Sequence, residues 1–150
     1  ASTADAHHIT APSPGGVGAI TCMRLALEEA GIDPEQVRHI NAHGTSTPLN
    51  DMAEALAMAE VFGPEGPLVT STKGITGHAL GAAGAIEAVA VVLAMRKGLI
   101  PPTAGYATPD PEMPPIHLVT GSPAQWEPGI SMSNSFGFGG HNGSLVIAPA

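Results

Sequence analysis

The sequence predicts an α/β domain built on a mainly parallel β-sheet with helices on its faces. Segments with helical and strand periodicity alternate along most of the chain, which is typical of parallel strands joined by helices. Glycine or glycine-proline steps separate many of these segments. A length of 150 residues is enough for one domain with its own core, so we expect residues 1–150 to form a single domain.

The first half of the chain is expected to contain two helices and two strands. Apolar residues at helical spacing define the helices, and a glycine ends each of them. Asn50 or Asp51 is the expected N-cap of the second helix, whose apolar stripe includes Leu56. In chain order we expect the tail of a strand or a loop over 1–14, a helix over 16–30, a strand over 38–42, the second helix up to Gly63, and a strand over 67–72.

The second half is expected to contain a long helix, an irregular segment and an antiparallel pair of strands. The helix is predicted over 77–97 and ends at Gly98, and the proline-rich segment 99–115 is expected to be irregular and exposed. A further strand is predicted over 116–120, and strands over 130–135 and 144–148 flank the glycine-rich turn 136–143.

The charge of the chain restricts its partners. The formal net charge is −8 with only five Lys and Arg, so we exclude nucleic acid and anionic membranes as partners. Charged residues make up 12% of the chain, about half the usual share. This shortage indicates a surface that is covered by another domain or subunit.

The single cysteine, Cys22, excludes an intrachain disulfide and a cysteine-based zinc cluster. Its position inside the first helix favours a buried structural role over that of a reactive thiolate. No signal peptide is evident. The longest apolar run, residues 79–95, is interrupted by Glu87 and is interpreted as a buried helix rather than a membrane span.

The segments 41–48 (NAHGTSTP) and 71–78 (STKGITGH) are the most distinctive of the chain. Each has a histidine, His43 or His78, where a strand is expected to end and a helix to begin. Open α/β sheets bind their ligands at such points. Neutral imidazoles there can donate hydrogen bonds to a developing oxyanion.

Three hydroxyl residues, Thr45, Ser46 and Thr47, follow His43 closely. They suit hydrogen bonding to a polar ligand that contains amides. The alternative is that Ser46 or Thr47 simply caps the next helix.

Lys73 and His78 share a glycine-rich turn that lacks both the Walker motif and the glycine spacing of a dinucleotide site. The positive charge of Lys73 is expected to keep the nearby histidine neutral. Glu87 lies in an apolar helix and needs a partner, which is a lysine, backbone donors or a bound cation. On one continuous helix His78 and Glu87 would lie about 180° apart, so we do not expect them to pair.

Three motifs together resemble those of β-ketoacyl-[acyl carrier protein] synthases: NAHGTSTP, STKGxxGHxxGAAG and SNSFGFGGxN. They are similar to the elongating enzymes of bacterial fatty acid synthesis, with polyketide ketosynthases as near relatives. The resemblance extends over essentially all 150 residues.

The resemblance implies a thiolase-like fold, in which two related halves are each built around a five-stranded sheet. The chain resembles the C-terminal half, so we expect a mixed five-stranded sheet flanked by helices, with the first strand missing before Ala1. The nucleophilic cysteine of the family lies in a small-residue motif of the N-terminal half, and Cys22 does not match it. The chain is therefore interpreted as incomplete at its N-terminus and inactive alone.

The activity implied is the decarboxylative Claisen condensation of malonyl-carrier protein with an acyl-enzyme. His43 and His78 match the histidines that hydrogen-bond the malonyl thioester oxygen, and Lys73 matches the lysine that holds the histidine network. Thr45 and Thr47 match residues that bind the phosphopantetheine arm.

The turn 136–143 contains four glycines around two phenylalanines. Phe138, with a glycine on each side, is positioned like a movable plug. It matches the gating phenylalanine of the family, whose backbone N–H contributes to an oxyanion hole for the acyl thioester. Phe136 is expected to contact substrate.

A monovalent cation, Na⁺ or K⁺, and several protein partners are also implied. Expected partners are an acyl carrier protein with phosphopantetheine-linked substrates, the N-terminal half, and a second copy in a homodimer, and the expected location is cytoplasmic. Both the carrier protein and this chain are acidic, so carrier docking is expected mostly on the other half. No organic cofactor is implied. In some family members the cation is held by a region that Asn41, Glu87, Ser133 and Asn134 match, which would give Glu87 its partner.

Four alternatives stay open at this point. The chain could belong to a polyketide ketosynthase or to a non-catalytic partner such as a chain-length factor, although retention of both His43 and His78 counts against the latter. A hydrolase or metal site would use His43, Asp51 and His78. The fragment could also act only as an assembly module.

Overall fold

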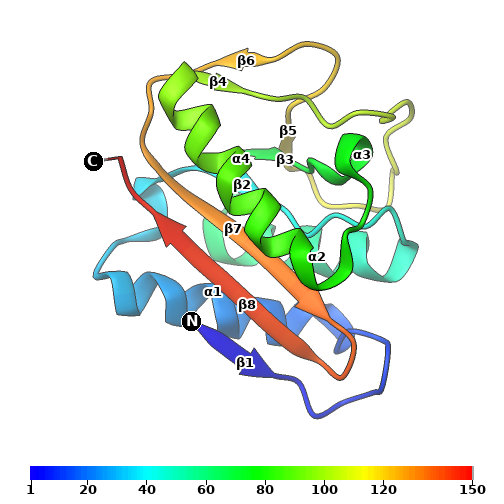
Figure 1. Ribbon diagram of the computed structural model, residues 1–150. Helices are drawn as coiled ribbons and strands as arrows, with labels where there is room; N and C mark the ends of the chain where they lie inside the picture. The colour runs from blue at the N-terminus through cyan, green and yellow to red at the C-terminus, as the bar shows by residue number, and fades with distance from the viewer. Residues whose placement is uncertain (150) are drawn as a thin grey trace.

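A mixed six-stranded sheet is the centre of the computed structural model, which describes residues 1–149 (Figure 1). The strand order is β1-β8-β7-β2-β3-β5. The strands β7, β2, β3 and β5 run parallel, while β8 is antiparallel to both β7 and β1. The predicted α/β class is thus confirmed. The strands of this sheet are β1 (Ser2–Ala4), β2 (Val37–Asn41), β3 (Leu68–Thr70), β5 (His117–Leu118), β7 (Ile130–Gly137) and β8 (His141–Ile147).

Helices cover both faces of the sheet. Figure 1 shows α1 (Val17–Ala30) and α2 (Pro48–Phe62) on the far face and α4 (Ala83–Lys97) on the near face. A two-stranded ribbon pairs Leu99–Ile100 (β4) with Ala124–Gln125 (β6). The sequence analysis predicted neither of these two strands. No helix among residues 1–149 is long and apolar enough to cross a membrane. Short helical segments are η1 (Pro14–Gly16), η2 (Pro34–Gln36), α3 (Lys73–Thr76) and η3 (Leu80–Ala82).

The main core lies between the sheet and the helices α1 and α2. Met23, Ile40 and Met132 are fully buried there. Because side chains alternate along a strand, the neighbours of Ile40, namely His39 and Asn41, face the α4 side. Buried polar groups therefore also lie on the side of the sheet that faces α4. Cys22 is buried within α1, as predicted.

The long helix predicted from residue 77 begins instead at Ala83. Gly77 and Leu80 have φ values of 67° and 51°, which an α-helix does not accommodate. The chain therefore turns twice after α3 before α4 starts. Since His78 lies in this turn and not on the helix, the argument that separated it from Glu87 by helical geometry is wrong.

The start of α2 also differs from the expectation. The helix begins at Pro48 with Thr47 at the N-cap position, not Asn50 or Asp51. Proline suits the first helical position because the N–H it lacks would have no partner there. Leu56 of the predicted apolar stripe is exposed, and Glu54 is buried in its place, because the helix is rotated to direct that carboxylate to the sheet.

The sheet has six strands rather than the expected five, because the short edge strands β1 and β5 both pair with their neighbours. The strand expected over 116–120 is reduced to two paired residues. The antiparallel pair is longer than predicted, because its ladder continues to Gly137 and His141. Gly139 and Gly140, with φ values of 83° and 73°, close the hairpin.

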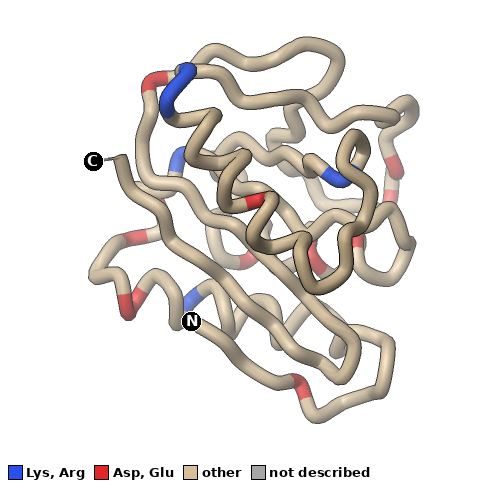
Figure 2. The backbone as a smooth tube through the Cα atoms, in the orientation of Figure 1, with Lys and Arg blue, Asp and Glu red and all other residues tan. Residues whose placement is uncertain are grey.

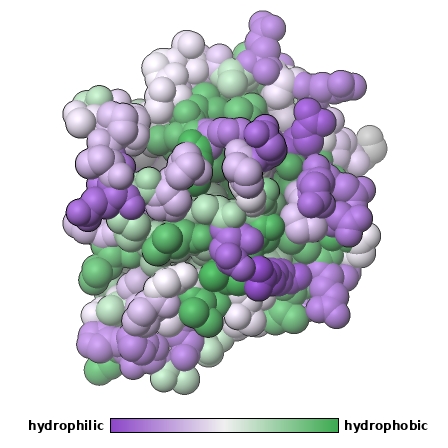
Figure 3. Space-filling model, turned by 180° about the vertical axis from the view of Figure 1, so that it is seen from behind, coloured by the Kyte–Doolittle hydropathy of each residue, from purple (hydrophilic) through white to green (hydrophobic). Residues whose placement is uncertain are grey.

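The surface is acidic and poor in positive charge. Figure 2 shows the few Lys and Arg residues scattered over the fold, with acidic residues spread along the chain. The outer face of α4 exposes large apolar side chains, among them Val89 at 58% and Leu93 at 49%. The opposite side of the molecule, seen in Figure 3, has hydrophobic patches interrupted by hydrophilic side chains.

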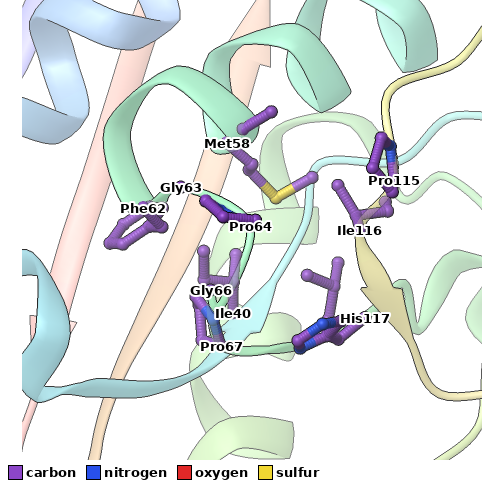
Figure 4. Close-up of a pocket in the computed structure, with 12 residues that line it drawn as sticks. Ile40, Met58, Phe62, Gly63, Pro64, Gly66, Pro67, Pro115, Ile116 and His117 are labelled. Atoms are coloured by element: carbon purple, nitrogen blue, oxygen red, sulfur yellow. The ribbon is translucent and has the colours of Figure 1, made fainter.

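A small apolar pocket lies between the end of α2 and the edge of the sheet (Figure 4). Met58 and Phe62 come from α2, Ile40 from β2, and Ile116 and His117 from the segment at β5. None of the predicted site residues lines it. We interpret the pocket as a packing feature of the sheet edge.

His39 predicts a pH dependence of stability. Burial lowers the pKa of this imidazole from 6.5 to about 4, and the ring packs edge-on against Trp126. Between these two pKa values the unfolded chain binds more protons than the folded one, so His39 lowers the free energy of unfolding as pH falls from 6.5 to about 4. The loss reaches at most about 3 kcal/mol.

The measurement is urea unfolding of the wild type and of His39→Gln from pH 7.5 to pH 4. Other buried groups titrate in both proteins, so the difference between the two free energies isolates His39. As the pH falls, we expect the free energy of unfolding of the wild type to decrease more than that of His39→Gln. Parallel curves for the two proteins would contradict the prediction.

Candidate active site

The two histidine segments meet at the carboxyl ends of the neighbouring strands β2 and β3. The rings of His43 and His78 lie 5.3 Å apart between centroids and cross at 83°. The ring of Phe136, from β7, lies 5.8 Å from that of His43. The structure therefore brings together three of the residues that the sequence predicted as site residues.

His43 is neutral at physiological pH. It is 6% exposed, and burial, with further contributions from Lys73 and His78, lowers the pKa of its ring to about 3. Its Nδ1 is buried and has no hydrogen-bond partner among the described residues. The ring is thus held in the site as an uncharged hydrogen-bonding group.

His78 is exposed, and one of its two ring nitrogens is already used. The backbone N–H of Leu80 donates to Nδ1 over 3.1 Å. Because Nδ1 accepts, the neutral ring has its proton on Nε2. His78 therefore offers an N–H donor in the site. The left-handed conformation of Leu80 produces this contact and is the kind of backbone strain found at functional sites.

Lys73 is the partner of Glu87. Its Nζ makes a buried salt bridge with Glu87 Oε1, and both side chains are almost inaccessible, at 5% and 1%. Burial is the largest influence on Glu87 and raises its pKa, while Lys73 acts in the opposite direction. Of the partners considered for Glu87, the structure contains the lysine. The lysine also helps to keep His43 neutral.

Glu54 is a site residue that the sequence interpretation missed. The backbone N–H groups of His43 and Gly44 donate to its two carboxylate oxygens over 2.8 Å and 2.9 Å. Burial raises the pKa of this carboxyl to about 7, against the effect of those hydrogen bonds. One feature of the sequence could have pointed to Glu54: it is an acidic residue between two alanines, Ala53 and Ala55, in the helix that follows the His43 turn.

The hydroxyl residues after His43 do not act as helix caps. Thr47 occupies the N-cap position of α2 but makes no side-chain cap hydrogen bond. Instead the hydroxyls of Thr45 and Thr47 bond to each other over 2.9 Å. Gly44 packs so closely on Ser71 that a Cβ would lie 2.6 Å from the serine Cβ, and the Ser71 hydroxyl donates to the Gly44 carbonyl.

The two phenylalanines of the β7–β8 hairpin have different environments. Phe136 is half-buried against His43. Phe138 is 77% exposed at the tip, where only the glycines 137 and 139 adjoin it. The role of Phe138 as a movable plug stays a prediction.

The residues expected to hold a monovalent cation divide between two faces of the sheet. Asn41 and Ser133 are register partners on β2 and β7. Among residues 1–149, the side-chain oxygen and nitrogen of buried Asn41 and Oε2 of Glu87 have no hydrogen-bond partner. Oxygens of this kind, an amide and a carboxylate without protein partners, have the chemistry that a monovalent cation would need. The Asn134 side chain is directed to the other face, where it bonds Glu54 and Ser144.

The alternative metal site at His43, Asp51 and His78 is not assembled. In the described part of the chain, no three His, Cys, Asp or Glu side chains come together as metal ligands. Asp51 instead accepts a hydrogen bond from its neighbour Asn50.

A family comparison agrees with this geometry. Residues 1–107 match the family described as "Beta-ketoacyl synthase, C-terminal domain", so the chain belongs to the β-ketoacyl synthase family.

Its curated relatives include 3-oxoacyl-[acyl-carrier-protein] synthase 2 of Synechocystis sp., 48% identical over 149 residues, which cover 98% of this chain and 36% of that protein. The Staphylococcus aureus protein of the same name is 46% identical over 148 residues, which cover 97% of this chain and 36% of that protein. The chain thus spans about a third of the length of these relatives.

Solved structures of ketosynthases have the same fold. A β-ketoacyl synthase from Burkholderia phymatum superimposes with a TM-score of 0.95 at 36% identity, over 99% of this chain and 36% of that one. A type II PKS acyl-carrier protein in complex with its ketosynthase gives the same TM-score and identity, over 100% of this chain and 37% of the matched one. These matches confirm the predicted thiolase-like class.

Proposed function

We propose that this chain supplies the histidine half of the active site of a 3-oxoacyl-[acyl carrier protein] synthase that elongates fatty acids. The observation that supports this best is the contact of two imidazoles, one neutral by burial and one with Nδ1 occupied, at the ends of adjacent parallel strands. Such a pair can place two N–H donors on one oxygen. A thioester oxygen that becomes an enolate is a substrate atom that needs them.

In the proposed reaction, the bond between the malonyl α-carbon and its free carboxylate breaks, and carbon dioxide leaves. The electron pair of that bond is delocalised onto the thioester oxygen, which gives an enolate. His43 and His78 stabilise that oxygen by roughly 3–4 kcal/mol per donor. The enolate carbon then attacks the acyl thioester on the nucleophilic cysteine, a carbon–carbon bond forms, and the cysteine thiolate leaves. Lys73 and Glu87 hold the network that keeps His43 uncharged.

Thr45, Thr47 and the hairpin phenylalanines are proposed to handle the substrate. The paired hydroxyls of Thr45 and Thr47 lie beside the site and suit the amides of a phosphopantetheine arm. Phe138 is proposed as the acyl gate because glycines on both sides free it to move. Phe136 is proposed to contact the substrate next to His43.

The proposed partners are an acyl carrier protein and a second half-domain. Support for the half-domain comes from the exposed apolar face of α4, since patches of this kind mark interaction surfaces. Leu49, Ile75 and Leu80, close in sequence to the site residues, are also exposed. A structural Na⁺ or K⁺ beside Asn41, Ser133 and Glu87 is proposed on the unpartnered oxygens there. The homodimer and the cytoplasmic location stay predictions.

A polyketide ketosynthase or a chain-length-factor-like subunit is the second candidate. Two solved neighbours are a ketosynthase with its chain length factor and a type II PKS ketosynthase complex. The intact histidine pair favours a catalytic ketosynthase over the non-catalytic subunit.

The proposal predicts that the 150-residue chain alone has no condensing activity. Its single cysteine is buried within α1, with its sulfur next to the Ala1 carbonyl, so it cannot serve as the nucleophile. Condensation of acyl- and malonyl-carrier protein is measured with this chain and with the polypeptide in which it is joined to a nucleophile-bearing half. Turnover is expected only from the joined protein. Clear turnover by the 150-residue chain would contradict the proposal.

A further inference from the structure

The proline-rich segment after β4 lies against the end of strand β3. The sequence predicted this segment to be exposed, but residues 101–104 are half-buried. The Thr70 hydroxyl donates to the Pro101 carbonyl over 2.7 Å, and the backbone N–H of Ser71 donates to Thr103 Oγ1 over 3.0 Å. Figure 1 shows the chain after β4 running towards α3. The proposed reaction assigns no role to these contacts.

Thr103 provides a hydrogen bond that the sheet does not give to Ser71. Strand β3 ends at Thr70, one residue earlier. Thr103 is itself fixed, since its backbone N–H donates to the Val119 carbonyl over 2.8 Å. Ser71 is buried, so loss of the Thr103 oxygen would leave its N–H without an acceptor.

Ser71 connects the two turns of the site. Its hydroxyl donates to the carbonyl of Gly44, the residue after His43, over 2.8 Å. Two residues further along the chain, Lys73 begins α3 and pairs with Glu87. Because these contacts are close-packed, a displacement of Ser71 also moves the Gly44 carbonyl and the start of α3.

Gly74 makes a second close contact between the segment and the Lys73 turn. A Cβ at this position would lie 2.4 Å from the backbone oxygen of Ala104. Its φ lies outside the left-handed region, so the limited space and not the backbone conformation requires glycine. The segment 101–104 is therefore in contact with both ends of residues 70–74.

We propose that Thr103 is a positioning residue that holds the proline-rich segment on Ser71 and so fixes the Lys73 turn and the His43 turn relative to each other. It bonds the main chain of Ser71 and acts through it on both turns. Its catalytic consequence rests on the proposed function. A displacement of about 1 Å at a reacting group can lose roughly 100-fold in rate.

The test compares Thr103→Val with Thr103→Ser in the joined polypeptide. Valine keeps the shape of threonine without its oxygen, whereas serine keeps the oxygen without the methyl group. For Thr103→Val we expect kcat for malonyl decarboxylation to fall at least about fivefold, with KM changed less than about twofold and acyl loading unchanged. Thr103→Ser is expected to stay within about twofold of the wild type. An equal loss in both variants would overturn the inference, because the hydroxyl would then not be the group that matters.

Thr108→Val is the matched control in the same segment. Thr108 is exposed, so its variant undergoes the same chemical change away from Ser71. We expect its decarboxylation kcat to stay within about twofold of the wild type. A fall as large as that of Thr103→Val would also overturn the inference.

Hydrogen exchange of the Ser71 amide is a second readout that requires no activity. This amide is expected to exchange slowly in the wild type and at least about tenfold faster in Thr103→Val. Gly74→Ala, which forces Ala104 away while Thr103 is intact, is expected to accelerate it at least about fivefold.

These measurements separate the role of Thr103 from the proposed function. Fast exchange of the Ser71 amide in the wild type overturns the inference, also if a variant fails to fold. A wild-type kcat in Thr103→Val overturns it too, provided that His43→Ala loses decarboxylation. If His43→Ala keeps decarboxylation, the proposed function fails, and hydrogen exchange alone decides on the role of Thr103.

Discussion

Lys73→Met is expected to lower the free energy of unfolding by about 3–5 kcal/mol, the usual cost of removing one partner of a buried ion pair. The Glu87 carboxylate, which is 1% exposed, would lose the ammonium that it contacts. Its second oxygen has no protein partner in the described chain, so other hydrogen bonds do not compensate. The measurement is urea unfolding at pH 7.5, where an unpartnered carboxylate must either remain charged or take up a proton.

Two comparison variants make this result specific. Arg24→Met breaks an exposed pair, with side chains 56% and 59% accessible, and should cost no more than about 1 kcal/mol. The double variant Lys73→Met/Glu87→Leu removes both charges and should recover most of the lost stability, because apolar replacements of buried pairs are often neutral. A loss for Lys73→Met no larger than that for Arg24→Met would contradict the assignment of a buried pair.

His43→Ala has the largest expected effect on chemistry. In the joined polypeptide we expect malonyl decarboxylation, and with it condensation, to fall about 100- to 1000-fold, because one donor to the enolate oxygen is lost. Both rates are measured with malonyl-carrier protein, in the presence and absence of an acyl donor. Circular dichroism serves as the control for folding, since the alanine also removes a ring packed against Phe136.

The sequence predicted which of the candidate residues lie together where this depends on local order along the chain. His43 and His78 each follow a strand, and parallel neighbouring strands bring such positions to one edge of the sheet. The hairpin that presents Phe136 was predicted from its adjacent glycines and strand residues. The α/β class and most strand positions followed from the same alternation.

Features that depend on long-range packing could not be predicted in the same way. The choice of Lys73 as the partner of Glu87 requires the turns at Gly77 and Leu80, which interrupt what periodicity describes as one helix. Glu54 was missed because the buried face of α2 is set by the His43 turn and by β7, neither of which affects helical spacing. The side of β7 that Asn134 faces is likewise known only once the register with β2 and β8 is known.

One measurement tests most directly whether this chain contributes the histidine half of an active site. Acyl transfer to the nucleophile and release of labelled carbon dioxide from malonyl-carrier protein are followed in the same sample of His43→Ala polypeptide. We predict acyl loading within about twofold of the wild type and carbon dioxide release lowered at least about 100-fold. Loss of acyl loading, or carbon dioxide release at the wild-type rate, would contradict the role assigned to His43.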